Sequence, residues 1–488
     1  IEYLNKYSNI KHYPINISER IIIKVKDING KSIPNAVIKI FGDDKIISSG
    51  LTYSDGSFLF FPSENNEKIF QYNAVISYMQ SNTKIEFDRQ GKREIEVKLD
   101  FQKSIMENIP LDILFILDVT SSMSEEIERL KATMEIIKLN IASISSKPAV
   151  RFGMVLYRDR GDNFITQITP LTKDLNIFQH EINEVTAMGG RDEPEDLQAA
   201  LKDTIETIEW NKDGIRLGFI ITDAPPHLDY GQKYTYVHAA SDAKRKGIKL
   251  FSVGTGGLNS TGEYILRQIS QYTSSKYIFL TYGEKGESEG GAPGSVSHHT
   301  GENYQTDKLE AIIIKIAKEE LSHFTDQPFD SGEDYFEANK IGTENKEETL
   351  QKLFSMAISQ LLDYSTYKIE EKIPTGMLPI ISKETSQNAN AEYFTEQLIF
   401  SLMKNNKLKV VERKDMQSIM KELELSETGL MDDTSAVKVG NLLGAKLLVS
   451  GNIYKKDNCF ELFLKLLRVE TGEILSITKL KVDLNLGL

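Results

Sequence analysis

Short hydrophobic stretches separated by polar turns fill the first hundred residues. The segments IIIKVKD, AVIKIFG and GSFLFFP are rich in β-branched and aromatic residues, and turn pairs such as Asn29-Gly30 and Asp55-Gly56 separate such runs. The later segments KIEF and EIEVKL alternate between apolar and polar positions. Runs of this kind, bounded by turn residues, are typical of strands. We therefore expect residues 1–104 to form an all-β sandwich.

The hydrophobic pattern changes after residue 105. The segment LDILFILDV is almost continuously apolar, as is typical of a parallel strand buried on both faces. Apolar residues then recur every three or four positions from Ile127 to Ile144, which indicates an amphipathic helix. Further strand-like segments, VRFGMVLY, LGFIIT and IKLFSVG, alternate with the helical patterns EDLQAALKDTIETIE and AASDAKRK. This alternation predicts a doubly wound, Rossmann-like α/β sheet over residues 105–326.

The remaining chain predicts a linker and one more domain. Residues 327–349 are acidic and rich in turn-forming residues, so we expect a linker there. From residue 350 to residue 488 helical and strand patterns alternate again, and the chain closes with KLLVSGNIY, CFELFLKLLRV and GEILSITKLKV. The sequence is therefore expected to be multidomain, with an α/β domain at its C-terminus.

Composition excludes several classes of protein. Aspartate and glutamate outnumber lysine and arginine by 71 to 58, for a net charge of −13. Nucleic-acid binding needs a basic surface, so we expect no nucleic-acid partner. A single cysteine, Cys459, excludes a disulfide framework or a cysteine zinc site within one chain. No apolar run approaches the ~18 residues that span a bilayer, so we expect no transmembrane segment.

Candidate chemistry lies where the strands of the central α/β region end. Asp118, Thr120 and Ser122 occupy alternating positions on a loop that starts a helix. Oxygen ligands of this kind suit the hard ion Mg²⁺, with Mn²⁺ or Ca²⁺ as alternatives. Taken alone, this motif could simply cap the helix. The segments GGRDEPE, with Asp192, and TDAPPH, with Asp223, border other predicted elements of the region, which strengthens the prediction of a metal site.

Three further polar residues belong to the same region of the predicted sheet. Asp159 and Asp162 in the segment YRDRGD could line the rim of the site. His227 follows Asp223 closely, but a histidine that bonds its own loop is the more common arrangement.

The motif Asp118-x-Thr120-x-Ser122, the later GGRDEPE segment and the Asp223 loop together resemble a von Willebrand factor A domain with a metal-ion-dependent adhesion site. The resemblance covers about residues 108–324. It implies that Thr120 and Ser122 bind the ion directly, that Asp118 and Asp223 act through water, and that a partner's carboxylate completes the coordination. The family usually has a threonine in the second loop, where the nearest candidate here is Asp192.

The outer regions resemble two other families. The stretch VKDINGKSIPNAVIKIFG with GLTYSDGSFLF resembles carboxypeptidase-regulatory-like domains. The C-terminal segments AEYFTEQLIFSLMK, TSAVKVGNLLGAKLLVSGNIY and LLRVETGEIL resemble the curli-assembly (CsgG-like) family and the related TolB-like folds. Both resemblances imply an extracytoplasmic location, in the periplasm, at the outer membrane or secreted, with a signal sequence removed.

These patterns leave three functions open. The first, which we favour, is a non-catalytic scaffold of the bacterial cell envelope that binds a protein partner's carboxylate through a divalent metal. The second is a secretion or assembly component that acts through a homo-oligomeric C-terminal domain. The third is a metal-assisted hydrolase with Asp192 or Glu195 as base. We expect no enzyme, because no recognisable motif pairs a nucleophile with a base.

Overall fold

The structure is a computed structural model that divides into two compact units. It describes residues 9–17, 19–65, 68–103, 108–144, 147–190, 193–255, 258–280, 304–306, 309–324, 350–365, 367, 369, 371–382, 388–411, 433–456 and 459–483. The first unit takes in residues 1–134, 146–312 and 319–341, and the second takes in residues 135–145, 313–318 and 342–488. The linker expected over residues 327–349 lies outside the described residues.

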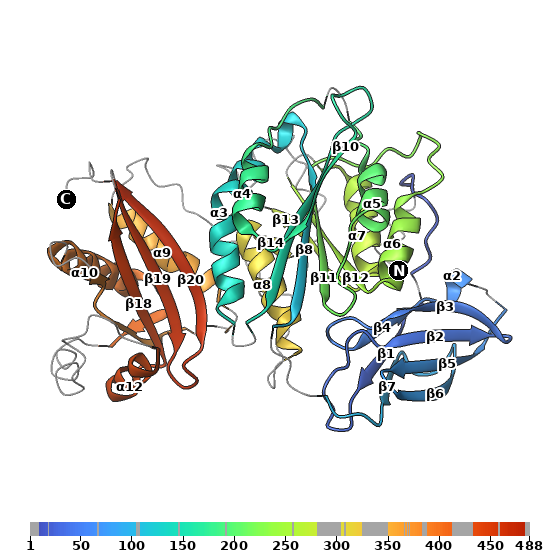
Figure 1. The fold of residues 1–488 in the computed structure, drawn as a ribbon, viewed down its shortest axis with the longest axis horizontal. Helices are drawn as coiled ribbons and strands as arrows, with labels where there is room; N and C mark the ends of the chain where they lie inside the picture. The colour runs from blue at the N-terminus through green and yellow to red at the C-terminus, as the bar shows by residue number, and fades with distance from the viewer. Residues whose placement is uncertain are drawn as a thin grey trace. The chain divides into compact units, whose positions relative to one another are not determined.

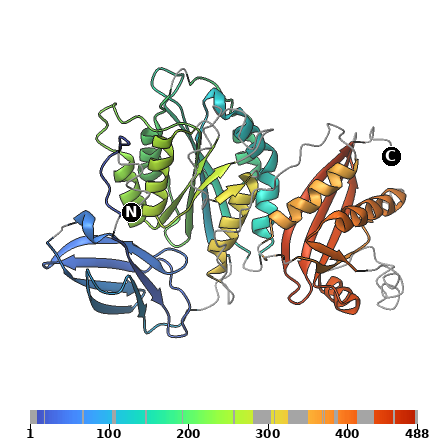
Figure 2. The same ribbon diagram turned by 180° about the vertical axis from the view of Figure 1, so that it is seen from behind.

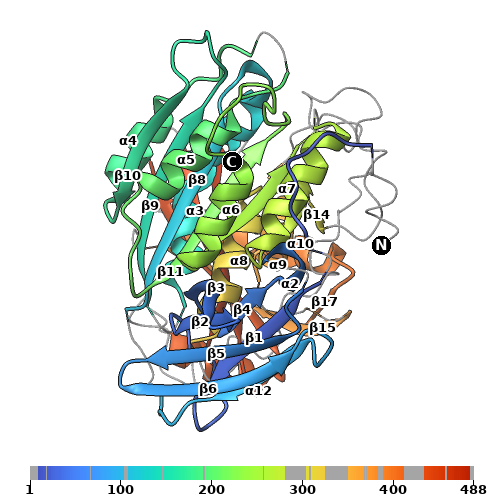
Figure 3. The same ribbon diagram turned by 90° about the vertical axis from the view of Figure 1, so that its right-hand side faces the viewer.

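The N-terminal part of the first unit is rich in β-strands. One sheet has the order β4-β1-β7 and the other has the order β3-β2-β5-β6, whose long strands β5 and β6 lie side by side in Figure 3. Side chains from both sheets point into one shared core, which includes Ile23, Ile38 and Tyr72. A short helix, α2, follows β4. The bounds are β1 (Ile21–Lys26), β2 (Val37–Gly42), β3 (Lys45–Leu51), β4 (Ser57–Phe60), α2 (Pro62–Asn65), β5 (Gln71–Tyr78), β6 (Ser81–Asp88) and β7 (Glu94–Lys98).

The centre of the first unit is a seven-stranded sheet with the order β10-β9-β8-β11-β12-β13-β14. All neighbouring strands are parallel except β10, which pairs with β9 in antiparallel fashion at the edge. Every residue of β11 and β12 is buried, as the continuous apolar pattern predicts. The bounds are β8 (Pro110–Asp118), β9 (Ala149–Tyr157), β10 (Thr166–Thr172), β11 (Ile215–Thr222), β12 (Ile248–Gly254), β13 (Tyr277–Leu280) and β14 (Tyr304–Thr306).

Helices cover both faces of this sheet. In Figure 1, α5, α6 and α7 lie on one face, and α3, α4 and α8 lie on the other. This arrangement confirms the predicted α/β architecture of the central region. Because the strands are parallel, the loops after β8 and β11 lie at the same edge of the sheet. The helix bounds are α3 (Ser124–Ala142), α4 (Leu175–Asn183), α5 (Leu197–Glu206), α6 (Tyr236–Arg245), α7 (Ser260–Tyr272) and α8 (Leu309–Ser322).

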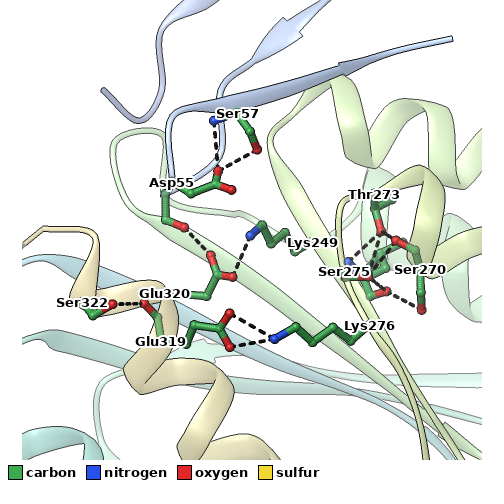
Figure 4. A network of polar contacts seen from close by, with 12 residues as sticks. Asp55, Ser57, Lys249, Ser270, Thr273, Ser275, Lys276, Glu319, Glu320 and Ser322 are labelled. Carbon is green, nitrogen blue, oxygen red and sulfur yellow. Dashed lines mark hydrogen bonds and ion pairs between the residues drawn. The ribbon is translucent and has the colours of Figure 1, made fainter. Parts of the chain in front are cut away.

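A network of buried polar contacts joins the β-rich part to the α/β part within the first unit (Figure 4). Lys249 Nζ on β12 lies 2.6 Å from Glu320 Oε1 on α8, and both side chains are buried. The hydroxyl of Ser54, just before β4, donates to the other oxygen of Glu320. Although burial lowers the pKa of Lys249, the charges of Glu320 and Asp55 raise it above its ordinary value. The ammonium group is therefore held charged inside the protein.

The second unit is a mixed sheet with the strand order β17-β15-β18-β19-β20, and β16 also pairs with β18. Figure 2 shows helix α9 lying across the long strands of this sheet, and α10 packs beside α9. Strands β18, β19 and β20, which occupy the three closing segments of the sequence, pair in antiparallel fashion. The bounds are α9 (Leu350–Asp363), β15 (Ile373–Met377), β16 (Ile381–Ser382), α10 (Asn388–Lys404), β17 (Leu408–Val410), α12 (Asp433–Leu443), β18 (Leu447–Lys455), β19 (Cys459–Arg468) and β20 (Ile474–Asp483).

Candidate metal centre

Asp118, the last residue of β8, forms the floor of the candidate site. Its Oδ1 accepts hydrogen bonds from the backbone nitrogen of Thr120 (3.0 Å) and from the Thr120 hydroxyl (2.7 Å). Its Oδ2 accepts a hydrogen bond from the hydroxyl of Thr222, the last residue of β11 (2.8 Å). Asp118 and Thr120 are buried. Both oxygens of Asp118 are thus occupied by donors, and the carboxylate orients the hydroxyls around it.

The hydroxyls of Thr120 and Ser122 lie side by side above this floor. Their oxygens are 3.3 Å apart. The side chain of Ser122 is exposed, so the site is open to solvent on the side of this residue. Residues Ser121–Met123 form a short 3-10 helix directly before α3, which fixes the direction of the loop. Asp223, which follows β11, is buried and accepts a hydrogen bond from Ser122. The structure therefore brings together four of the five residues predicted from the sequence.

The second loop of the site packs directly against the first. Gly189 and Gly190 have positive φ angles, and a Cβ on Gly190 would lie 2.8 Å from the Cβ of Thr120. The backbone nitrogen of Gly190 donates to Asp162 Oδ2 (3.3 Å), so Asp162 holds this loop. Asp192, the fifth predicted residue, lies outside the described residues. Its expected role as a ligand stays a prediction.

Glu195 also belongs to the second loop, but it was not among the metal ligands predicted from the sequence. Its backbone pairs with the loop that carries Asp223: Glu195 N donates to Pro225 O, and His227 N donates to Glu195 O, each over 3.0 Å. The side chain is 3% exposed, and its Oε2 has no hydrogen-bond partner among the described residues. The only signal in the sequence was its position, three residues after Asp192 in a segment already identified as part of the site.

Carboxylates crowd this edge of the sheet, and their pKa values are raised accordingly. Burial raises the pKa of Asp118, and the charge of Asp223 raises it further. Burial also raises the pKa of Asp223. Burial and the charges of four aspartates raise the pKa of Glu195 to about 9; the four are Asp118, Asp159, Asp162 and Asp223. Closely spaced carboxylates without a balancing cation repel one another.

Asp159 and His227 lie at the rim and contact each other. Tyr230 donates its hydroxyl to Asp159, 2.7 Å from each carboxylate oxygen, and its ring stacks on the imidazole of His227. His227 Nδ1 lies 2.7 Å from Asp229 Oδ1, and Nε2 lies 3.3 Å from Asp159 Oδ1 without hydrogen-bond geometry. His227 is therefore held by its own loop and by Asp159, as expected for the more common arrangement.

The residues present suit a hard, octahedral cation. Adjacent ligands of an octahedral ion with bonds of ~2.1 Å lie about 3 Å apart, close to the separation of the Thr120 and Ser122 oxygens. The unpartnered oxygen of Glu195 offers a further oxygen donor, which a bound cation would hold in its anionic form. Within the described ranges no three histidine, cysteine, aspartate or glutamate side chains converge as a metal site by themselves. Binding here would therefore depend on the two hydroxyls.

Two regions of the chain match known families. Residues 112–283 match the von Willebrand factor A domain, and residues 349–479 match the peptidoglycan-synthase activator LpoB. The second match differs from the sequence-based expectation, because it supports an LpoB-like C-terminal domain and not a CsgG-like one. The carboxypeptidase-regulatory-like resemblance of the N-terminal residues stays a prediction.

Individual relatives cover parts of the chain. An α-protein kinase, vwkA, from Dictyostelium discoideum is 34% identical over 200 residues, which are 38% of this chain and 29% of the kinase. Integrin beta-6 from Ovis aries is 22% identical over 206 residues, which are 36% of this chain and 24% of the integrin. The chain thus spans less than a third of the length of either relative.

One solved structure aligns with the C-terminal part of the chain. The LpoB C-terminal domain from Salmonella enterica aligns with 20% identity over 28% of this chain and 96% of that domain, with a TM-score of 0.23. Among the helices that the structure describes, none combines the length and the apolar character required to cross a bilayer.

Proposed function

We propose that this chain is a non-catalytic adaptor of the bacterial cell envelope that binds a partner protein's carboxylate through a divalent metal ion. One observation carries the proposal: the Thr120 and Ser122 hydroxyl oxygens lie 3.3 Å apart above Asp118, beside the unpartnered oxygen of Glu195. The match of residues 112–283 to the von Willebrand factor A domain supports the same conclusion.

In this proposal Thr120 and Ser122 bind the ion directly, and Mg²⁺ is the preferred metal, with Mn²⁺ or Ca²⁺ as alternatives. Asp118 accepts a hydrogen bond from the Thr120 hydroxyl, so the lone pairs of that hydroxyl oxygen would be free for the metal. Asp223 holds Ser122 in the same way. Glu195, and Asp192 from the same loop, supply negative charge next to the ion. The ion itself would polarise the groups bound to it and attract an acidic ligand.

The open side of the site determines what can complete the coordination. Ser122 is exposed, whereas Asp118, Thr120 and Glu195 are buried. A bound ion would therefore be reached from the Ser122 side by a group that projects from another molecule. A carboxylate suits this position because it is a hard anionic oxygen ligand. An aspartate or glutamate side chain of a protein partner has the reach to place it there.

The C-terminal domain supplies a second contact in this proposal. Helix α10 buries Phe394, Leu398 and Leu402, but it leaves Tyr393, Phe400 and Met403 exposed on another face. Exposed aromatic and methionine side chains of this kind mark protein contacts. The match to the peptidoglycan-synthase activator model supports an enzyme of cell-wall synthesis as the partner of this face. Such a partner would place the chain outside the cytoplasm.

The metal and the carboxylate can be tested together with Mn²⁺ as the probe. Water-proton relaxation is measured for the full chain with Mn²⁺, and a short peptide containing one aspartate is then added. We expect the bound ion to enhance relaxation, and we expect the aspartate peptide to lower that enhancement by displacing water. The matched peptide with asparagine should have no effect. An enhancement that is equal in Asp118→Ala, or equal with both peptides, contradicts the proposal.

The C-terminal contact needs a separate measurement. A purified peptidoglycan synthase is immobilised, and binding of the full chain is compared with that of Phe400→Ser. We expect Phe400→Ser to lower the affinity for the synthase at least about tenfold, because the substitution removes apolar area from the contact. Phe400 is exposed in the chain, so the substitution should leave the fold intact. Glu392→Gln, at an exposed position of the same helix, serves as the control. Equal binding by Phe400→Ser and the parent chain would exclude this face.

A further inference from the structure

A cavity of about 290 Å³ lies between the β-rich part and the α/β part of the first unit. Its walls come from β3, α2, α6 and the end of α7. Two isoleucines give it an apolar side, and three serines give it hydroxyl groups. The lining residues are Ile46, Ile47, Ser48, Ser49, Glu64, Ser241, Lys244, Arg245 and Tyr272.

Lys244 of α6 is the one residue of this lining that offers an amine. The side chain is only 5% exposed, and its Nζ lies over three aromatic rings: 4.7 Å from the centroid of Tyr272, 5.4 Å from Phe61 and 5.6 Å from Phe58. Within the part of the chain that the structure describes, this nitrogen makes no hydrogen bond or ion pair. Burial lowers the pKa of Lys244 to about 8, against the opposing charge of Glu64.

Two other lysines of the same unit show how unusual this arrangement is. Lys249 is as buried as Lys244, but its ammonium group is paired with Glu320 at 2.6 Å. Burial also lowers the pKa of Lys103 to about 8, yet its Nζ donates to the carbonyls of Ser32 (2.9 Å) and His323 (3.2 Å). The nitrogen lone pair of a lysine becomes available when no acceptor holds the proton. Only Lys244 of these three combines a lowered pKa, no acceptor and an adjoining cavity.

The other charged and titratable groups around the cavity are engaged in contacts of their own. Glu64 accepts a hydrogen bond from the hydroxyl of Tyr272 (2.5 Å), and burial raises the pKa of that phenol, so it stays protonated. Arg245 is paired with Asp242 at 2.8 Å and is largely exposed. The cavity therefore suits a small, uncharged and partly apolar molecule better than an anion.

We propose that Lys244 is a nucleophilic lysine that forms an imine with a small aliphatic aldehyde bound in this cavity. The amine nitrogen attacks the carbonyl carbon, and transfer of a proton from nitrogen to oxygen gives a carbinolamine. Loss of water then gives the imine, so no oxidant or reductant is required. The serine hydroxyls can hydrogen-bond the carbonyl oxygen during the attack, and the isoleucines pack against the alkyl chain.

The test traps the imine with a mild reductant. The full chain is incubated with propanal and cyanoborohydride at pH 7.5, and the propylated lysines are quantified over time by peptide mass spectrometry. We expect Lys244 to react at least about tenfold faster than the exposed Lys212, because burial lowers the pKa of Lys244 to about 8 and its nitrogen adjoins the cavity. Lys103 and Lys249 should react more slowly than Lys212. The rate at Lys244 should rise with a midpoint near pH 8.

A second variant separates the cavity from the lysine itself. Ser48→Leu places extra volume in the cavity and leaves Lys244 in position. We expect it to slow the labelling of Lys244 at least tenfold and to leave the labelling of Lys212 unchanged. The proposal is overturned if Lys244 is labelled no faster than Lys212, or if Lys244 is labelled faster than Lys212 only in denaturant. It is also overturned if Lys244 is labelled as fast in Ser48→Leu as in the parent chain.

Discussion

The hydroxyl of Thr120 donates to Asp118 Oδ1 over 2.7 Å, and its oxygen lies 3.3 Å from the hydroxyl oxygen of Ser122. Asp118 thus fixes the direction of the threonine proton, and the lone pairs of the same oxygen are not used by that hydrogen bond. A hydroxyl prepared in this way can bind a hard cation without losing its proton. The relationship makes Thr120 the most sensitive position for testing the metal proposal.

Replacing the Thr120 hydroxyl should remove metal-dependent stabilisation. Valine has nearly the same shape as threonine but cannot bind a metal, so Thr120→Val should lose the Mg²⁺-induced gain, which is about 2.7 kcal/mol at a hundredfold excess over the dissociation constant. Thr120→Ser keeps the hydroxyl and should retain most of the gain. Thermal unfolding followed by the fluorescence of Trp210, the single tryptophan, reports on the first unit. A full Mg²⁺ effect in Thr120→Val would contradict the assignment.

Glu195 should contribute to metal affinity through its charge. Its buried Oε2 has no partner among the described residues, so Glu195→Gln removes an anionic donor without changing the shape of the loop. We expect the affinity for Mn²⁺, measured by calorimetry, to fall at least about tenfold. The same substitution at the exposed Glu181 on α4 should leave the affinity unchanged. Equal affinities in the two variants would show that Glu195 does not face the ion.

The buried pair Lys249–Glu320 should be strongly coupled. Removing one partner leaves an uncompensated buried charge, so Lys249→Met should lower the free energy of unfolding by about 3–5 kcal/mol. The double variant Lys249→Met with Glu320→Leu should cost much less than the sum of the two single variants. Urea unfolding followed by Trp210 fluorescence measures all three. Additive costs would mean that the pair does not interact in solution.

Lys244 should make the stability of the first unit depend on pH in the alkaline range. Its pKa is 10.5 in the unfolded chain and about 8 in the folded protein. Between these values the unfolded chain binds more protons, so stability should rise as the pH rises from 8 to 10.5. Below pH 8 the full cost is present, on the order of 3 kcal/mol.

Lys244→Met should abolish this dependence and stabilise the protein at neutral pH. Methionine fills similar space beside the three rings and carries no charge. The comparison is made by urea unfolding at pH 7 and at pH 10, where the gain from the substitution should shrink. A gain of equal size at both values would show that the ammonium group is not the source of the cost.

The sequence by itself determined the strands and helices whose patterns arise locally. Strand β12 occupies the apolar segment Ile248–Gly254 as predicted, and β8 occupies the segment LDILFILDV, because both faces of a central parallel strand must be apolar. Strand β10 was not predicted, since an edge strand buries only part of its surface and its pattern is correspondingly weak. The Asp118-x-Thr120-x-Ser122 motif was visible because its three side chains belong to one short loop.

Only the tertiary structure decided which distant groups lack a partner. Glu195 enters the candidate site because its backbone pairs with the loop after β11, and that pairing leaves one buried carboxylate oxygen without a donor. Lys244 belongs to an ordinary helical pattern, and its environment arises from rings on β4, on α7 and just after β4. Periodicity along a chain encodes which residues are buried. The pairing of buried polar groups depends on contacts between segments far apart in sequence, and it is therefore settled only when the chain folds.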